Sequence, residues 1–262
     1  MAHVPGRKAL SGPALIRLLA RLTDAGLPES GRPLADQLGQ WLVWTDAVAL
    51  SAALGGHAPV GASHGLAPDP AHEALCMRVR SSLTEAITRA AMLAPQRLVH
   101  PARNRPDQAG SDTAPDYAAF RRCYLSLQEE MESAIGNLRT LLREKLAARA
   151  PAMSRLASVD AVMERVLGMR EHNALAAVPG LLAAHFERLR DAEAATCERA
   201  HAGLLDATQP ATPAATRAAN SPAPKDGPWL DAFRKDMQSV LFAELEIRFQ
   251  PVEGLRAALR AS

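Results

Sequence analysis

The sequence predicts an all-α fold: an elongated helical bundle with one long heptad-like helix and with helices bent at prolines. The strong helix formers Ala, Leu, Arg and Glu dominate the composition, whereas β-branched and aromatic strand formers are scarce. Apolar residues recur three and four positions apart in several segments, with Pro and Gly at the segment ends. Aromatic residues make up only 4% of the 262 residues. A core built mainly from aliphatic side chains suits long, thin helical packing.

Two helices are predicted in the first 56 residues. The first runs over 11–25, with Ser11 as its N-cap, a proline in its first turn and Gly26 at its end. The second begins near Pro33 and carries the segment "LADQLGQWLVWTDAVALSAAL" to the paired glycines at 55 and 56. Its apolar residues keep helical spacing throughout, so we expect one continuous helix.

The third helix is predicted between two mobile loops, and the fourth between the second loop and Pro151. Loops are expected near 55–68 and 95–115, and the third helix lies between them, from a cap at Asp69 to about Ala94. The fourth, 116–150, is the longest at roughly 50 Å. Its basic C-terminal end is expected to interact with the helix dipole. The predicted heptad-like seam consists of Tyr117, Phe120, Tyr124, Leu127, Met131, Ala134, Leu138 and Leu141.

A Val-Pro-Gly sequence separates the fifth and sixth helices, predicted over 158–178 and 180–205. His172 and His185 flank it and raise the question of a metal site. On a continuous helix they would lie about 20 Å apart, too far to share one ion. Leu175, Val178, Leu182, Phe186 and Leu189 instead keep helical spacing through the break. The sequence therefore predicts a packing surface with a kink or short turn, and neither a metal nor a cofactor.

The chain divides into a bundle over 1–205, a disordered Pro/Ala/Thr/Ser linker over 206–228 and an amphipathic C-terminal helical segment over 229–262. We expect that segment to bend or restart at Pro251. It holds the candidate docking residues Trp229, Phe233, Phe242 and Phe249. Two alternatives remain open: these aromatic residues bind a partner protein, or they complete the chain's own core.

Composition and motifs indicate a soluble, cytoplasmic, non-enzymatic protein. No uncharged apolar run reaches the ~18 residues of a membrane span, and the N-terminus lacks a signal-peptide pattern. Cys76, Cys123 and Cys197 have no paired spacing, which predicts reduced, buried thiols. Phosphate-binding loops and nucleophile elbows are absent from the sequence. We expect a helical interaction or scaffold protein that binds a protein partner through amphipathic helices, with self-association left open.

Nucleic-acid binding is the alternative function. The net charge of +2, from 30 basic and 28 acidic residues, is too balanced for a dedicated nucleic-acid coat. Acidic residues dilute the one arginine-rich loop, and no aromatic residues interleave with it for base stacking. The candidate contacts are Arg97, Arg103, Arg105, Arg121 and Arg122.

Three stretches of the chain resemble an uncharacterised family of bacterial proteins of similar length. They contain "LIRLLARLTDAGLPESGRPLADQLGQWLVW", "AAVPGLLAAHFERLR" and "ELEIRFQPVEGL". The resemblance implies a cytoplasmic accessory factor encoded beside MotA/MotB-like membrane motor proteins with long helical tails, in clusters similar to Zorya-type antiphage systems. It thereby implies a membrane-motor complex as the partner. It carries over no catalytic or ligand-binding residue.

Overall fold

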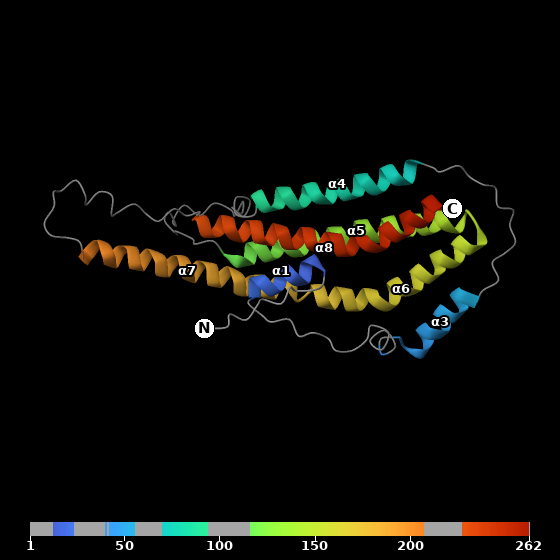
Figure 1. Ribbon diagram of the computed structural model, residues 1–262, viewed down its shortest axis with the longest axis horizontal. Helices are drawn as coiled ribbons and strands as arrows, with labels where there is room; N and C mark the ends of the chain where they lie inside the picture. The colour runs from blue at the N-terminus through green and yellow to red at the C-terminus, as the bar shows by residue number, and fades with distance from the viewer. Residues whose placement is uncertain are drawn as a thin grey trace, which may run out of the picture.

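The computed structural model describes residues 13–23, 40, 42–55, 70–93, 116–206 and 227–261, and these form helices and short connections without a β-strand. The predicted all-α fold is thereby confirmed. In Figure 1 the longer helices lie roughly along the long axis of an elongated bundle. The helices are α1 (Ala14–Thr23), α3 (Trp44–Gly55), α4 (Pro70–Leu93), α5 (Tyr117–Ala147), α6 (Pro151–Leu175), α7 (Val178–Asp206) and α8 (Pro228–Ala261).

The long helix α5 begins where the sequence predicts. Asp116 caps it, and its side chain accepts a hydrogen bond of 3.0 Å from the amide of Ala118. Beyond Met131 the buried face differs from the predicted seam. Ile135 and Leu142 are buried in the core, whereas the predicted residues Ala134 and Leu141 are only half-buried. A straight helix turns every 3.6 residues, so its buried face drifts away from a strict heptad pattern.

Helix α8 lies at the centre of the molecule. It packs against α1, α4, α5, α6 and α7, and its buried side chains belong to the same core as theirs. It runs through Pro251 as a single helix, so the helix does not restart there. The buried residues of α8 are Leu230, Phe233, Met237, Val240, Leu241, Ala243, Glu244, Leu245, Arg248, Phe249, Val252, Leu255 and Leu259.

The Val-Pro-Gly sequence lies at the start of a helix. Helix α6 ends at Leu175, two turn residues follow, and α7 starts at Val178. Pro179 is therefore in the first turn of α7, where its missing N–H is not needed for an intrahelical bond. Leu175, Val178, Leu182 and Phe186 are all buried, as expected for a packing surface. Helix α6 begins at Pro151, earlier than predicted, because proline is also well suited to the first position of a helix.

The predicted second helix is shorter than expected within the described residues. Helix α3 begins only at Trp44, and Leu42 and Val43 before it are not helical. The carbonyl of Val43 accepts hydrogen bonds from the amides of Asp46 and Ala47, so Val43 directly precedes the first turn of the helix. The helical spacing of apolar residues continues through Leu42 and Val43, and neither Pro nor Gly lies directly before Trp44 to indicate this start. Most of 24–41, the predicted loops beyond Gly55 and the linker 207–226 lie outside the described residues.

Candidate functional site

The aromatic residues of the C-terminal segment lie in the chain's own core. Phe233 is fully buried, with ring centroids 5.1 Å from Phe120 of α5 and 5.0 Å from Phe186 of α7. Half-buried Trp229 stacks edge-on against Phe186 at 5.1 Å. Phe249 is buried as well, and Phe242 is half-buried against the same core. This arrangement corresponds to the intramolecular alternative, because buried rings are not available to a partner.

The structure describes only some of the arginines predicted to contact nucleic acid. Arg97, Arg103 and Arg105 lie outside the described residues. Arg121 and Arg122 are exposed in the first turns of α5. Two adjacent arginines on one helix do not by themselves form a basic surface of the size that nucleic acids require.

The two histidines beside the Val-Pro-Gly sequence take different partners. Exposed His172 lies 3.3 Å from Glu132 of α5, measured from Nδ1 to the carboxylate. Buried His185 lies 2.8 Å from Asp236 of α8 through Nε2. Within the described residues, no group of three or more His, Cys, Asp or Glu side chains is placed to hold a metal ion.

The cysteines differ in environment, and the expectation that all three are buried is wrong for Cys197. Cys76 is buried and Cys123 half-buried, and burial raises the pKa of both thiols. Cys197 is exposed because it lies on the part of α7 beyond residue 190, where nearly every residue faces solvent. The apolar spacing that buries the first half of this helix does not continue there.

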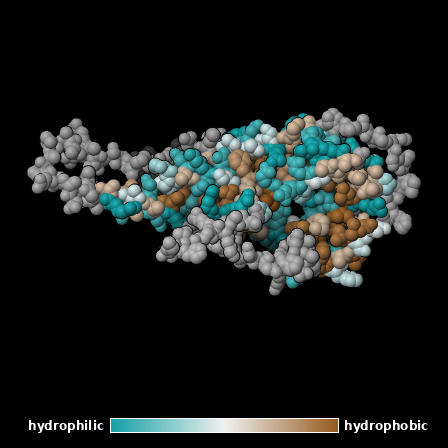
Figure 2. Space-filling view, viewed as in Figure 1, coloured by the Kyte–Doolittle hydropathy of each residue, from teal (hydrophilic) through white to brown (hydrophobic). Residues whose placement is uncertain are grey.

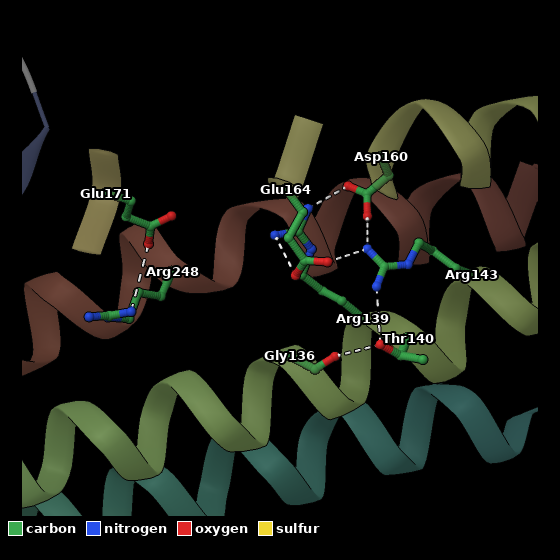
Figure 3. Close-up of polar contacts among 8 residues, drawn as sticks. All are labelled: Gly136, Arg139, Thr140, Arg143, Asp160, Glu164, Glu171 and Arg248. Carbon is green, nitrogen blue, oxygen red and sulfur yellow. Dashed lines mark hydrogen bonds and ion pairs between the residues drawn. The ribbon is translucent and has the colours of Figure 1, made fainter. Parts of the chain in front are cut away.

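Four charged side chains join α5 to α6 and form what we call the charged tetrad: Arg139, Arg143, Asp160 and Glu164. Arg139 lies 2.8 Å from Asp160 and 3.2 Å from Glu164. Arg143 lies 3.2 Å from Asp160 and 2.5 Å from Glu164, and donates a further hydrogen bond of 3.0 Å to Thr140 (Figure 3). The basic end of α5 thus meets carboxylates of α6 in addition to its own helix dipole. Two positive and two negative charges balance within the tetrad.

A buried carboxylate organises the contact between α5 and α8. Glu244 is fully buried and accepts hydrogen bonds from Tyr124 at 2.6 Å, from Gln128 at 3.0 Å and from the Nε of Arg248 at 2.9 Å. Burial, and then the charge of Glu244, raise the pKa of Tyr124 well above its usual range. Gln128 also donates to the carbonyl of Leu175 at the end of α6. This network fixes the register of three helices.

A hollow of about 310 Å3, lined by charged and apolar residues, lies between α5, α6 and α8. Gly136 of α5 and Gly168 of α6 line it, and a methyl group added at either position would meet nothing within 4 Å. Arg139 and Glu164 of the charged tetrad belong to its lining, as do Arg248 and Glu171, which lie to the left of the tetrad in Figure 3. The lining residues are Glu132, Ile135, Gly136, Arg139, Glu164, Gly168, Met169, Glu171, His172 and Arg248.

Helix α3 presents an exposed apolar face. None of its residues is buried, and Trp44 is 80% exposed. It packs on α6, and the half-buried residues of this contact include Ala49, Leu50 and Ala53. Figure 2 shows hydrophobic surface gathered over this part of the molecule. We call the outer side the α3 face; its exposed large residues are Val43, Trp44, Val48 and Leu54.

The fold and these surfaces define an elongated all-α bundle with a hollow beside α6 and an apolar helix packed on α6. The chain belongs to the family described as "Protein of unknown function (DUF3348)", whose model matches residues 1–261. The predicted membership of an uncharacterised family is thereby confirmed. No curated protein and no solved structure matches the chain. Of the helices that the structure describes, none combines the length and the apolar character needed to cross a membrane.

Proposed function

We propose that this protein is a non-enzymatic helical interaction protein and that the α3 face binds a partner protein. The observation that supports the proposal is the exposure of an apolar helix within the part of the chain that the structure describes. A helix that is apolar on all sides is normally enclosed by other structure, yet Trp44, Val48 and Leu54 are each at least half exposed. Exposed apolar surface gathered on one element is typical of an interaction site.

The chemistry of the α3 face selects the kind of partner. Its one charged residue, Asp46, is half-buried, and the helix contains neither Lys nor Arg. Helices that bind membrane surfaces carry basic residues for the anionic lipids, so a membrane is a poor fit. The apolar side of an amphipathic helix from another protein fits a face that is apolar and uncharged.

The sequence resemblance supports a choice of partner. It points to a cytoplasmic accessory factor encoded beside MotA/MotB-like motor proteins in Zorya-like phage defence, and the helical tail of such a motor protein would supply an amphipathic helix. In this proposal the partner binds to the α3 face. The C-terminal aromatic residues act inside the bundle and stabilise it. Self-association through the same face is the competing outcome.

The test is co-expression of the tagged protein with the neighbouring motor protein, followed by purification. Trp44→Asp places a charge in the centre of the α3 face. Met77→Asp is the matched control, because Met77 is an apolar residue of α4 that is 58% exposed. We expect the motor protein to co-purify with the wild type and with Met77→Asp, and to be lost with Trp44→Asp.

Each other result contradicts part of the proposal. Retention of the motor protein by Trp44→Asp would show that the α3 face is not the docking surface. A wild-type protein that purifies without the motor protein, as a dimer that Trp44→Asp dissociates, would assign the face to self-association.

A further inference from the structure

Two glycines line the hollow between α5, α6 and α8. Gly136 and Gly168 lie on different helices, and a side chain added at either would enter open space. A volume of about 310 Å3 is at the lower end of the range for ligand pockets. It suits a single long side chain better than a nucleotide or a larger cofactor.

The charges around the hollow do not cancel. The tetrad is neutral by itself, and Arg248 is paired at 2.9 Å with the buried carboxylate of Glu244. Two other carboxylates have weaker partners. Glu171 forms only a long ion pair with Arg248, at 3.9 Å, which is beyond hydrogen-bond distance. Glu132 has His172 at 3.3 Å, which balances its charge only when the imidazole is protonated. The wall therefore has an excess of negative charge.

The buried arginine beside this wall does not reverse its negative charge, because it has its own carboxylate partner. The side chain of Arg248 is only 7% exposed and its charge is already satisfied by Glu244. An incoming anion would meet Glu132, Glu164 and Glu171, which repel it. An incoming cation would meet Glu132 and Glu171, whose side chains are 55% and 37% exposed.

The remaining wall is apolar. Ile135 is buried at the base, and Met169 is 66% exposed. An arginine side chain matches this combination, because its aliphatic stem packs on apolar surface while its planar guanidinium binds carboxylates.

From these observations we infer that the hollow binds the guanidinium group of an arginine that a partner protein inserts between Glu132 and Glu171. This inference rests on the proposed function, since it takes the partner to be a protein, and it adds the residue type that the partner must present. The hollow and the α3 face both lie on α6, so one partner helix running along α6 would use both.

The test titrates the full-length purified protein with acetyl-Ala-Arg-Ala-amide and follows backbone amide resonances by NMR. The control ligand is the same peptide with citrulline, which has the shape of arginine without its charge. We expect saturable shifts at Gly136 and Gly168 with the arginine peptide, and at least tenfold weaker binding of the citrulline peptide.

Two variants test the location. Gly168→Leu fills the hollow and abolishes saturation, whereas Gly254→Leu is the matched control, because Gly254 also lies within a helix with open space around it. Glu171→Gln removes one carboxylate and is expected to weaken binding about tenfold. It serves as the second variant should Gly168→Leu fail to fold.

Equal binding of the two peptides, no saturation with arginine, or unchanged binding to Glu171→Gln would overturn the inference. The titration needs no partner protein, so it gives its answer even if co-purification with the motor protein fails. A failed titration likewise leaves the test of the α3 face intact.

Discussion

Helices α8 and α3 differ in how far they are buried, and the difference is the reverse of what their positions in the sequence suggest. α8 follows a long Pro/Ala-rich segment, yet it lies at the centre of the molecule and contacts α1, α4, α5, α6 and α7. α3 is the more apolar of the two and belongs to the first part of the chain, yet none of its residues is buried. An apolar pattern shows that a helix has a surface to cover, but it does not show what covers it.

The strength of the attachment differs accordingly. α8 buries Phe233 and Phe249 among side chains of several helices and fixes its register through Glu244. α3 rests on α6 through half-buried residues such as Ala49 and Ala53. Small side chains allow close approach but remove little apolar area from water. The bundle should therefore depend strongly on α8 and weakly on α3.

The largest expected effect is that of removing an aromatic side chain from α8. Phe233→Ala should lower the free energy of unfolding by about 4 kcal/mol, because it leaves a cavity against Phe120 and Phe186. Trp44→Ala on α3 should change it by less than about 0.5 kcal/mol. Urea unfolding followed by circular dichroism measures both. Similar losses for the two variants would contradict the difference between the helices.

The buried carboxylate gives the next largest effect. Glu244→Gln should cost about 3 kcal/mol of unfolding free energy, because it leaves the guanidinium of Arg248 buried without its counter-charge. Glu246→Gln is the matched control two residues away. Its partner is Arg80, and because 58% of Glu246 is exposed we expect a loss of less than about 1 kcal/mol.

Alkaline pH should weaken the contact between α5 and the start of α7. Tyr117 donates a hydrogen bond to the carbonyl of Pro179, and burial raises the pKa of its phenol from 10 to about 12. The folded state therefore keeps a proton that the unfolded chain releases. The contribution to stability is complete below pH 10 and is lost as the pH rises towards 12.

Tyr117→Phe supplies the comparison for this pH effect. The variant should unfold more easily than the wild type at neutral pH, by about 1 kcal/mol for the lost hydrogen bond. Its stability should then fall less steeply above pH 10, so that the two unfolding curves converge. Parallel curves over that interval would show that the phenol of Tyr117 titrates normally.

The smallest effect concerns the thiols and leaves stability unchanged. In native protein a disulfide reagent should react quickly with Cys197 on the outer part of α7 and slowly with Cys76 and Cys123, whose pKa values are raised by burial. Peptide mapping after a short reaction identifies the modified residue. Rapid modification of Cys76 would mean that α4 separates readily from α8.

Periodicity in the sequence is sufficient to predict the fold class, the start of α5 and the packing role of the Val-Pro-Gly region. Leu175, Leu182 and Phe186 are spaced so that only one side of the chain can be buried. The heptad pattern, however, misplaces Ala134 and Leu141, because which of two adjacent residues is buried depends on the position of neighbouring helices.

The hollow between α5, α6 and α8 was harder to predict, because its lining residues come from separate helices. Gly136 and Gly168 have no sequence signal as a pair, and the space between them exists only when α5 and α6 are packed together. The motif "ELEIRF" offered one clue, since it places Glu244 and Arg248 four residues apart within an apolar stripe. Charged residues at core positions predict a buried pair, but the sequence does not name Tyr124 and Gln128 as its other partners.

Native-state hydrogen exchange tests the contrast between the two helices most directly. We predict that amides in the middle of α8, around 240–249, exchange only through global unfolding, whereas those of α3 exchange through local opening at a much lower free energy. Exchange of the α8 amides as fast as those of α3 would contradict the account, because it would make the C-terminal helix a detachable segment and not the centre of the bundle.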